Sequence, residues 1–335
     1  MSKGIELITC MPGYDSFYLF DEVPKHVYPA GSLALMQPKP INTQHLQYCL
    51  VVLVDGSPLG RLAVYHNPYL THEHQPLLLI GNFECIDDTA VAKVLMDEVL
   101  RESHGYGYVL ATMNGSSWDD YRLPVNDCTS PFFTDLLQPA YYSKLFEAMG
   151  FDRIHTYYSR ASANTFHTAD QQLIDTLAAE GIRIRGIDLD NYEADLKQLH
   201  KLSTVAFAGN TFYSPIDEVD FIRRYLPLKP YLDPNLVLIA QQGNEPVAFT
   251  LALHDAYQPK NERIVVKTLA KHPACTAKGL IDAMIQLSCS YAYANGCRQL
   301  VHAFIHGDNK SLLISQKYNG EVLREYALYI KPIQQ

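Results

Sequence analysis

Residues 47–66 have the sequence QYCLVVLVDGSPLGRLAVYH, which is a mostly apolar run, a turn and a second apolar run. This pattern predicts a β-hairpin, because apolar runs form buried strands and Asp, Gly, Ser and Pro favour turns. Residues 236–254, LVLIAQQGNEPVAFTLALH, have the same arrangement, and an offset of 188 positions places Pro58 on Pro246. The chain is therefore predicted to contain the same hairpin twice.

The segments that follow the two hairpins agree as well. Each hairpin precedes a third apolar strand, a segment of helical periodicity, another strand, a short helix and a Gly that leads into a Tyr-rich strand. The strand, helix, strand and short helix are predicted at 77–80, 90–101, 108–111 and 141–149, and again at 264–269, 279–293, 299–305 and 310–318. This order predicts a tandem duplication of one α+β unit, with chance similarity as the alternative.

Length and local composition place the boundary between the two units. A chain of 335 residues corresponds to about two domains of ~100–200 residues each. Small and polar residues, ASANTFHTA at 161–169, interrupt the pattern. We therefore predict domains at 1–165 and 166–335, the second opening with helices near 171–180, 194–208 and 217–225.

Composition excludes several classes of protein. Hydrophobic residues make up 47% of the chain and charged residues 19%, so a sizeable core can form and a disordered chain is excluded. No apolar run approaches the ~18–20 residues of a bilayer crossing, and the start MSKGIELITC lacks the pattern of a signal peptide, which predicts a cytoplasmic protein with no membrane partner. Seven scattered cysteines without a C-x-x-C motif indicate reduced thiols.

The charge is distributed unevenly. A formal net charge of −9 argues against a nucleic-acid partner and favours cationic ligands such as amines. Residues 260–280 run against this average, with five basic residues and one acidic residue for a net charge of +4. The equivalent residues 76–96 have one basic and three acidic residues, for a net charge of −2. An anionic cofactor is therefore expected in the second half.

Residues 267–280, KTLAKHPACTAKGL, form a predicted strand, a loop of small residues and the start of a helix. Backbone N–H groups at a helix N-terminus are unpaired and favour anions, so this loop suits a pyrophosphate. No P-loop, G-x-S-x-G or H-E-x-x-H motif is present. His72 and His74 could ligate a metal, but no further ligand cluster is evident nearby, so a solvated loop is favoured and no metal is expected.

Thr276-Ala277-Lys278-Gly279-Leu280-Ile281 resembles the coenzyme A loop of the GNAT acyltransferases, which usually reads Gln/Arg-x-x-Gly-x-Gly/Ala. Gly279 matches the central glycine, whereas Thr276 and Ile281 depart from the pattern. The first half resembles a group of two-domain bacterial GNAT proteins at Gly81-Asn82-Phe83-Glu84-Cys85, at Met113–Ser117 and at Pro139–Tyr142. The resemblance covers most of the chain and implies an α+β protein with tandem GNAT folds. Each would be a mixed, mainly antiparallel sheet flanked by helices.

The resemblance also implies a cofactor site in the second half. The fourth and fifth strands of each unit would splay to admit the pantetheine arm of acetyl-CoA or another acyl-CoA, and the backbone N–H groups of Leu269–Lys271 would stabilise the oxyanion. The first half would lack a working coenzyme A loop. The implied cofactor-binding residues are Leu269, Ala270, Lys271, Thr276, Ala277, Lys278, Gly279, Leu280 and Asn309.

The catalytic acid and base are not assigned by the sequence. His254, Asp255 and Glu262 lie near the relevant strands and are candidate bases, although surface solvation explains each equally well. The family often protonates the leaving thiolate with a Tyr in the helix after Asn309. Gln316 occupies that position here, so Ser315 is a weaker candidate.

The acceptor is expected between the two domains, where the first half would keep a substrate-binding or an architectural role. Asn114, Trp118, Asp119 and Asp120 form a polar, acidic stretch that could line a pocket for an amine, with a surface loop and a buried Trp118 as the alternative. The resemblance implies an N-acyltransferase acting on a small amine or amino-acid-like acceptor. The alternatives are a non-catalytic acyl-CoA sensor and transfer from an acyl-carrier protein. A homodimer is compatible with the sequence.

Overall fold

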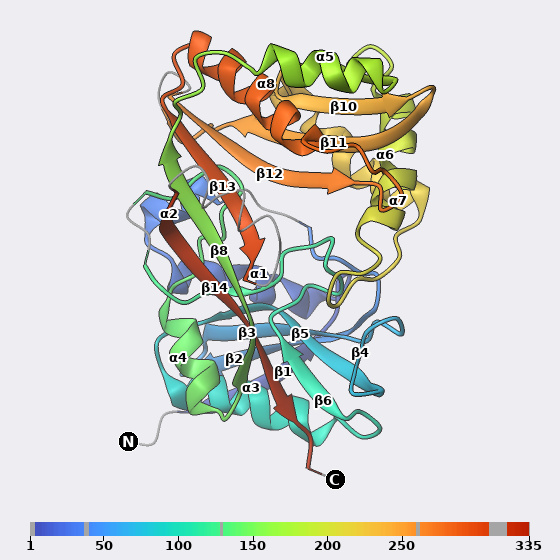
Figure 1. Ribbon diagram of the computed structural model, residues 1–335. Coiled ribbons are helices and arrows are strands. Elements are labelled where there is room, and N and C mark those ends of the chain that lie inside the picture. Colours follow the sequence, from blue (N-terminus) through green and yellow to red (C-terminus); the bar gives the residue numbers. More distant parts are fainter. Residues whose placement is uncertain (1–3, 37–39, 128–129, 259–261, 308–319, 335) are drawn as a thin grey trace.

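The computed structural model describes residues 4–36, 40–127, 130–258, 262–307 and 320–334 (Figure 1). The elements of the first half are β1 (Ile5–Cys10), α1 (Tyr18–Val27), α2 (Ala30–Leu35), β2 (Leu46–Val54), β3 (Ser57–Tyr65), β4 (Thr71–His72), β5 (Gln75–Cys85), α3 (Thr89–Arg101), β6 (Tyr108–Ala111), β7 (Leu123–Pro124), α4 (Tyr141–Ala148) and β8 (Asp152–Ala163). Those of the second half are α5 (Gln171–Ala179), β9 (Ile182–Gly186), α6 (Tyr192–Ala206), α7 (Glu218–Tyr225), β10 (Val237–Gln242), β11 (Glu245–His254), β12 (Arg263–Lys271), α8 (Leu280–Ala294), β13 (Gln299–His306) and β14 (Glu321–Pro332). Short 3-10 helices span Asp15–Phe17 and Leu226–Tyr231.

The predicted repeat is present in the strand pairing. Hairpins β2–β3 and β10–β11 are antiparallel, and each is followed by a strand that pairs with β3 or β11. Helices α3 and α8 then connect this strand to a parallel neighbour, which gives the pairs β5–β6 and β12–β13. The α+β class and the mixed, mainly antiparallel sheet are confirmed. The helix predicted at 310–318 lies outside the described residues.

Alternating side chains divide the core into layers on the two faces of the sheet. In β2, Leu50 and Val52 pack with the apolar face of α3, whereas Cys49 and Val51 pack on the opposite face with residues of α1. In β10, Ile239 faces the cluster that contains α6 and α7, and its neighbours face α5 and α8. This period of two is what a strand buried on both faces requires.

The closing strands of the two halves are exchanged. The sheet order is β1-β2-β3-β5-β6-β14-β8-β13-β12-β11-β10-β9, with β4 and β7 paired to β5 and β14. Strand β14, which ends the second half, pairs with β6 of the first half, while β8, which ends the first half, pairs with β13 of the second. Figure 1 shows β8 and β14 side by side through the middle of the molecule. One continuous sheet therefore joins the two halves.

Several elements were not predicted from the sequence, namely β1, α1, α2, the two-residue strands β4 and β7, and the edge strand β9. The described cysteines, which exclude Cys128, are free thiols, as expected. Over the same described parts of the chain, no helix has both the length and the apolar composition needed to cross a membrane.

Candidate functional site

A cavity of about 1550 Å³ lies where the two halves meet. Its first-half walls come from residues 40–44, from residues 114–122 and from β8. Its second-half walls come from α6, α7, residues 207–213 and the ends of β12 and β13. The volume exceeds the ~300–1,000 Å³ of a typical small-molecule pocket, so the cavity can hold two ligands of moderate size.

Strands β12 and β13 diverge at this cavity. Their parallel pairing begins at Arg263 and Gln299 and ends at Val266 and His302. The residues beyond this point, 267–269 on β12 and 303–306 on β13, line the cavity. A bulge in β12 at Lys267 accompanies the divergence, because β11 pairs with Val266 and then with Thr268. Bulges bend a strand and increase its twist, which directs the end of β12 away from β13.

The corresponding position in the first half is filled by Asn114. The amide Oδ1 of Asn114 accepts a hydrogen bond from the backbone N–H of Asn82 at 2.7 Å, and Met113 N donates to the carbonyl of Ile80 at 2.7 Å. These hydrogen bonds extend the pairing of β5 and β6 beyond Ala111, into the residues that follow β6. A Cβ atom at Gly81 would lie 2.6 Å from Asn114 Oδ1, so the amide packs directly against the glycine. The two halves therefore differ in whether this gap is open.

The helix N-termini that follow the two strands also differ. The carboxylate of Asp88 accepts a hydrogen bond from Ala90 N and so caps α3. Helix α8 begins after Gly279, which has a φ of 72° and no side chain to act as a cap. The first turn of α8 carries the carboxylate of Asp282, so both helix starts hold an acidic side chain, but only at α3 does the N-cap residue itself supply it.

The predicted cofactor-binding residues occupy different environments. Leu269 lines the cavity, Ala277 and Leu280 are buried, and Thr276 and Lys278 are exposed on the loop before α8. Lys271 extends into the loop and donates a hydrogen bond to the carbonyl of Ala277, and Ala270 is buried. Asn309 and Ser315 lie outside the described residues. The assignment of this set to a cofactor stays a prediction.

The predicted acceptor residues Asn114, Trp118, Asp119 and Asp120 are brought together on the cavity wall. The Trp118 indole N–H donates to the carbonyl of Ser214 at 2.8 Å, so this side chain both lines the cavity and joins the halves. Asp119 Oδ1 lies 2.6 Å from the guanidinium of Arg224. Because Arg224 already neutralises this carboxylate, Asp119 is a weak partner for a cationic amine.

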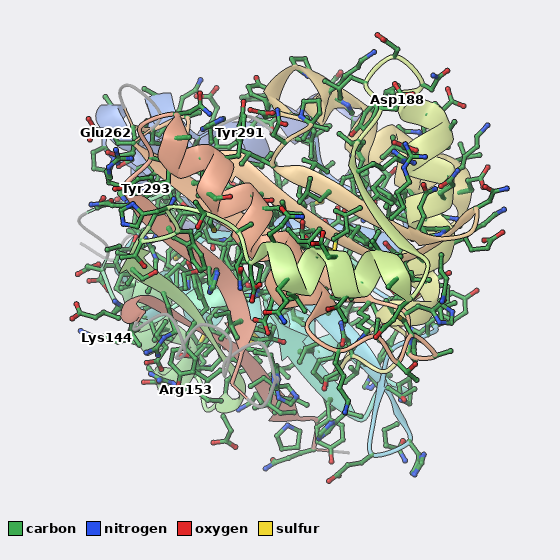
Figure 2. All side chains as sticks on the ribbon, turned by 45° about the horizontal axis from the view of Figure 1, so that its top comes forward. Lys144, Arg153, Asp188, Glu262, Tyr291 and Tyr293 are labelled. Atoms are coloured by element: carbon green, nitrogen blue, oxygen red, sulfur yellow. The ribbon has the colours of Figure 1, made fainter. Side chains whose placement is uncertain are left out.

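The three candidate bases do not lie among the described cavity-lining residues. His254 Nε2 is 3.5 Å from Asp233 Oδ2. Glu262 is exposed, and its backbone carbonyl accepts hydrogen bonds from Arg298 and Gln299; Figure 2 shows it at the edge of the molecule. The interpretation of Asp255 as a solvated surface residue is wrong, because Asp255 is fully buried and its carboxylate lies 2.5 Å from Arg263 Nε.

Three histidines on the cavity wall were not singled out from the sequence. His306 ends β13, and its Nε2 lies 3.2 Å from Nδ1 of His155 on β8. His302 is buried four residues earlier on the same strand, and burial lowers its pKa from 6.5 to about 4. The sequence signal was one histidine within the predicted strand 299–305 and a second directly after it, but His155, the partner of His306, is brought close only by the strand exchange.

The titration of His302 predicts a pH dependence of stability. The folded-state pKa of about 4 lies below the ordinary value of 6.5, so the unfolded state takes up a proton first as the pH falls. The free energy of unfolding should therefore decrease between pH 6.5 and pH 4, by about 3 kcal/mol in total. Urea denaturation of wild type and of His302→Phe at several pH values checks this: the wild type should lose stability relative to the variant below pH 6.5. A constant difference between the two proteins would contradict it.

Comparisons with known proteins give structural matches alone. No protein-family model and no curated protein matches the sequence. A GCN5-related glucosamine N-acetyltransferase region of a fungal multi-domain GH3 β-N-acetylglucosaminidase matches with a TM-score of 0.60 and 10% identity. That match covers 99% of this chain but only 38% of the fungal chain.

Two further structures match along nearly their whole length. A GCN5-related N-acetyltransferase from Sphaerobacter thermophilus has a TM-score of 0.55 and 12% identity, over 98% of this chain and 96% of that chain. A tandem GNAT protein from the clavulanic acid biosynthesis pathway has a TM-score of 0.55 and 11% identity, over 99% of both chains. At these identities a match establishes the fold. The chain therefore has the tandem GNAT fold of GCN5-related N-acetyltransferases.

Proposed function

We propose that the protein is an acyl-CoA-dependent N-acyltransferase that binds its acyl-CoA, with acetyl-CoA as the first candidate, in the second half. The observation that carries the proposal is the divergence of β12 and β13 at the cavity, where the first half has Asn114 in the equivalent gap. An extended pantetheine arm needs such an opening between two strands. The start of α8, whose N-cap residue Gly279 has no side chain, lies beside the exposed Lys278 and supplies N–H groups and positive charge for the pyrophosphate.

The acceptor would enter the same cavity from the first-half side. It would add to the thioester carbonyl beside the end of β12 and form the N–C bond of a tetrahedral oxyanion. Collapse of this oxyanion breaks the C–S bond and releases coenzyme A as a thiolate, which takes up a proton from water. The nucleophile is the neutral amine, so the ammonium form of the acceptor must lose a proton to a base within hydrogen-bond reach. We propose His306 as this base. The hydrogen bond between its Nε2 and His155 Nδ1 fixes the orientation of the imidazole at the end of β13.

A charge reversal on the loop before α8 tests the cofactor site. Lys278→Glu should weaken the binding of acetyl-CoA at least tenfold, a loss of about 1.4 kcal/mol, because the new carboxylate repels the pyrophosphate. Isothermal titration calorimetry with acetyl-CoA and with longer acyl-CoAs measures this.

The matched control is Lys144→Glu, which makes the same charge change at an exposed position of α4 (Figure 2). This variant should bind acetyl-CoA as the wild type does. Absence of acyl-CoA binding by the wild type, or equal weakening in both variants, would contradict the proposal.

A non-catalytic acyl-CoA sensor is the second candidate. It is motivated by Gln316, which stands where the family often has a Tyr that protonates the thiolate. Tight binding of acyl-CoA without release of coenzyme A across a broad panel of amines would favour the sensor. Transfer from an acyl-carrier protein would instead be indicated by turnover with the acylated carrier but not with acyl-CoA.

A further inference from the structure

Arg122 is a buried guanidinium on the wall of the cavity. Arg122 is 6% exposed and lines the cavity between the two halves. The guanidinium carbon lies 3.7 Å from the ring centre of Tyr121, 4.1 Å from that of Tyr157 and 4.8 Å from that of Phe304. These three rings hold the guanidinium in place from the loop after β6, from β8 and from β13.

Within the described residues, Arg122 differs from the other buried arginines in its partners. Arg263 is 3% exposed and Arg324 is 4% exposed, and each pairs with a buried carboxylate, of Asp255 and Asp135 respectively. No described carboxylate forms an ion pair with Arg122, and its Nε and Nη1 atoms have no hydrogen-bond partner there. A buried charge with unpaired donors is costly, and contacts with aromatic faces offset only part of that cost.

The backbone at Arg122 is held in an unusual conformation. Its φ is 75°, which is uncommon for a bulky residue, and its N–H donates to the carbonyl of Thr112 at 2.8 Å. Thr134 and Phe304, which also line the cavity, have φ values of 76° and 57°. The Oγ1 atom of Thr134 is buried and has no hydrogen-bond partner. Strained residues of this kind persist where the surrounding structure fixes them, often at ligand sites.

The position of Arg122 relates it to the reacting groups proposed above. The ring of Tyr157 contacts the Arg122 guanidinium on one side, and its centre lies 4.9 Å from the ring centre of His306. A small molecule with an anion on Arg122 would thus extend past one tyrosine ring to the base. Two other arginines of the cavity wall are already paired, Arg224 with Asp119 and Arg223 with Asp220.

We propose that Arg122 binds an anionic group of the acceptor, a carboxylate or a phosphate, so that the acceptor is an amine that also carries a negative charge. That the ligand is an acyl acceptor rests on the proposed function. The binding of an anion by Arg122 does not depend on that function. A planar guanidinium matches the oxygens of either group, and the Nε and Nη1 donors of Arg122 are buried and unpaired. The acidic composition of the chain favours amines in general, and Arg122 restricts them to those with an anionic end.

Binding without acyl-CoA tests the anion site directly. Trp118 is the only tryptophan of the chain and lines the same cavity, so its fluorescence reports occupancy. The probes are unbranched ω-amino acids with one to four methylene groups, ω-aminoalkylphosphonates of equal length and the corresponding n-alkylamines. The wild type should bind a carboxylate or a phosphonate at least tenfold more tightly than the alkylamine of equal length. The stronger of the two anionic series identifies the natural group.

Two variants and a matched control assign this preference to Arg122. Arg122→Gln should remove the preference, and Arg122→Lys should restore part of it through its charge. Arg223→Gln removes an equal charge from the exposed side of the same cavity and should leave the preference intact. An unchanged affinity of Arg122→Gln for acetyl-CoA shows that the variant is folded. Equal binding of amines and amino acids, no binding of any probe, or a preference that survives Arg122→Gln would overturn the proposal.

Failure of this inference is distinguishable from failure of the proposed function. Release of coenzyme A with alkylamines as readily as with amino acids would refute the anion site and leave the acyltransferase intact. Arg122-dependent binding of amino acids by a protein that does not bind acyl-CoA would refute the acyltransferase and leave the anion site.

Discussion

Replacement of His306 by Asn is expected to lower kcat by about 10²–10⁴-fold, the usual contribution of a general base. Asn has similar polarity but cannot accept a proton at neutral pH, so the loss should fall on kcat and not on the affinity for acetyl-CoA. Steady-state release of coenzyme A with a saturating amine measures kcat, and calorimetry measures the binding of acetyl-CoA to the same variant.

His155, the hydrogen-bond partner of His306, provides a second test of the same assignment. His155 lies 3.2 Å from His306 through Nδ1 and Nε2 and orients the imidazole. His155→Asn should lower kcat less than His306→Asn, and the double variant should be no slower than His306→Asn alone, because residues that act as one unit have non-additive effects. His254→Asn serves as the comparison, since this histidine pairs with Asp233 and lies apart from the cavity-lining residues. Equal losses of kcat in His254→Asn and His306→Asn would contradict the assignment.

Local patterns predicted the elements whose sequence is strongly periodic. The hairpin strands, α3 and α8 were predicted to within a few residues, because apolar spacing and turn residues act over short distances. Strand β6 was predicted with its observed limits. Strand β9 was missed although Ile182, Arg183, Ile184 and Arg185 alternate as strand residues do. The alternating pattern of β9 was therefore present in the sequence, but it extends over only five residues.

The strand exchange could not be predicted in the same way. Strands β8 and β14 each have 12 residues and similar Tyr-rich sequences, so either would satisfy the same neighbours by its pattern alone. The choice of partner depends on contacts between residues far apart in the chain. His155 and His306 are 151 positions apart and meet only because β8 pairs with β13. The candidate base was therefore hidden from sequence analysis.

Burial of charged groups was also hidden. Arg122 follows Trp118, Asp119, Asp120 and Tyr121 in a polar stretch that has the composition of a surface loop. Nothing in this composition distinguishes an exposed arginine from one enclosed by three aromatic rings. Asp255 similarly follows a strand end where a solvated carboxylate is common. In both cases the segment that encloses the side chain comes from the other half of the molecule or from a distant loop.

Replacement of Asp255 by Ala is expected to lower the free energy of unfolding by about 3–5 kcal/mol, the cost of leaving the partner of a buried ion pair uncompensated. Asp255 is fully buried, and its Oδ2 lies 2.5 Å from Arg263 Nε. Its Oδ1 accepts hydrogen bonds from the backbone N–H groups of Phe133 at 2.8 Å and Tyr257 at 3.0 Å. Asp255 thus connects the first-half loop at Phe133 to Arg263 at the start of β12. Urea denaturation measures the loss of unfolding free energy in the variant.

The same variant decides between a structural and a catalytic carboxylate. If Asp255 acts only in the fold, the molecules of Asp255→Ala that remain folded at low temperature should keep the wild-type kcat. Glu193→Gln, which breaks an exposed ion pair with Lys197, should cost no more than about 1 kcal/mol and serves as the control for charge removal. The double variant Asp255→Leu with Arg263→Met should recover only part of the stability, because it removes both buried charges but leaves the N–H groups of Phe133 and Tyr257 without their acceptor. A loss of kcat with unchanged stability would instead return Asp255 to the candidate bases, and would require the cavity to extend to β11.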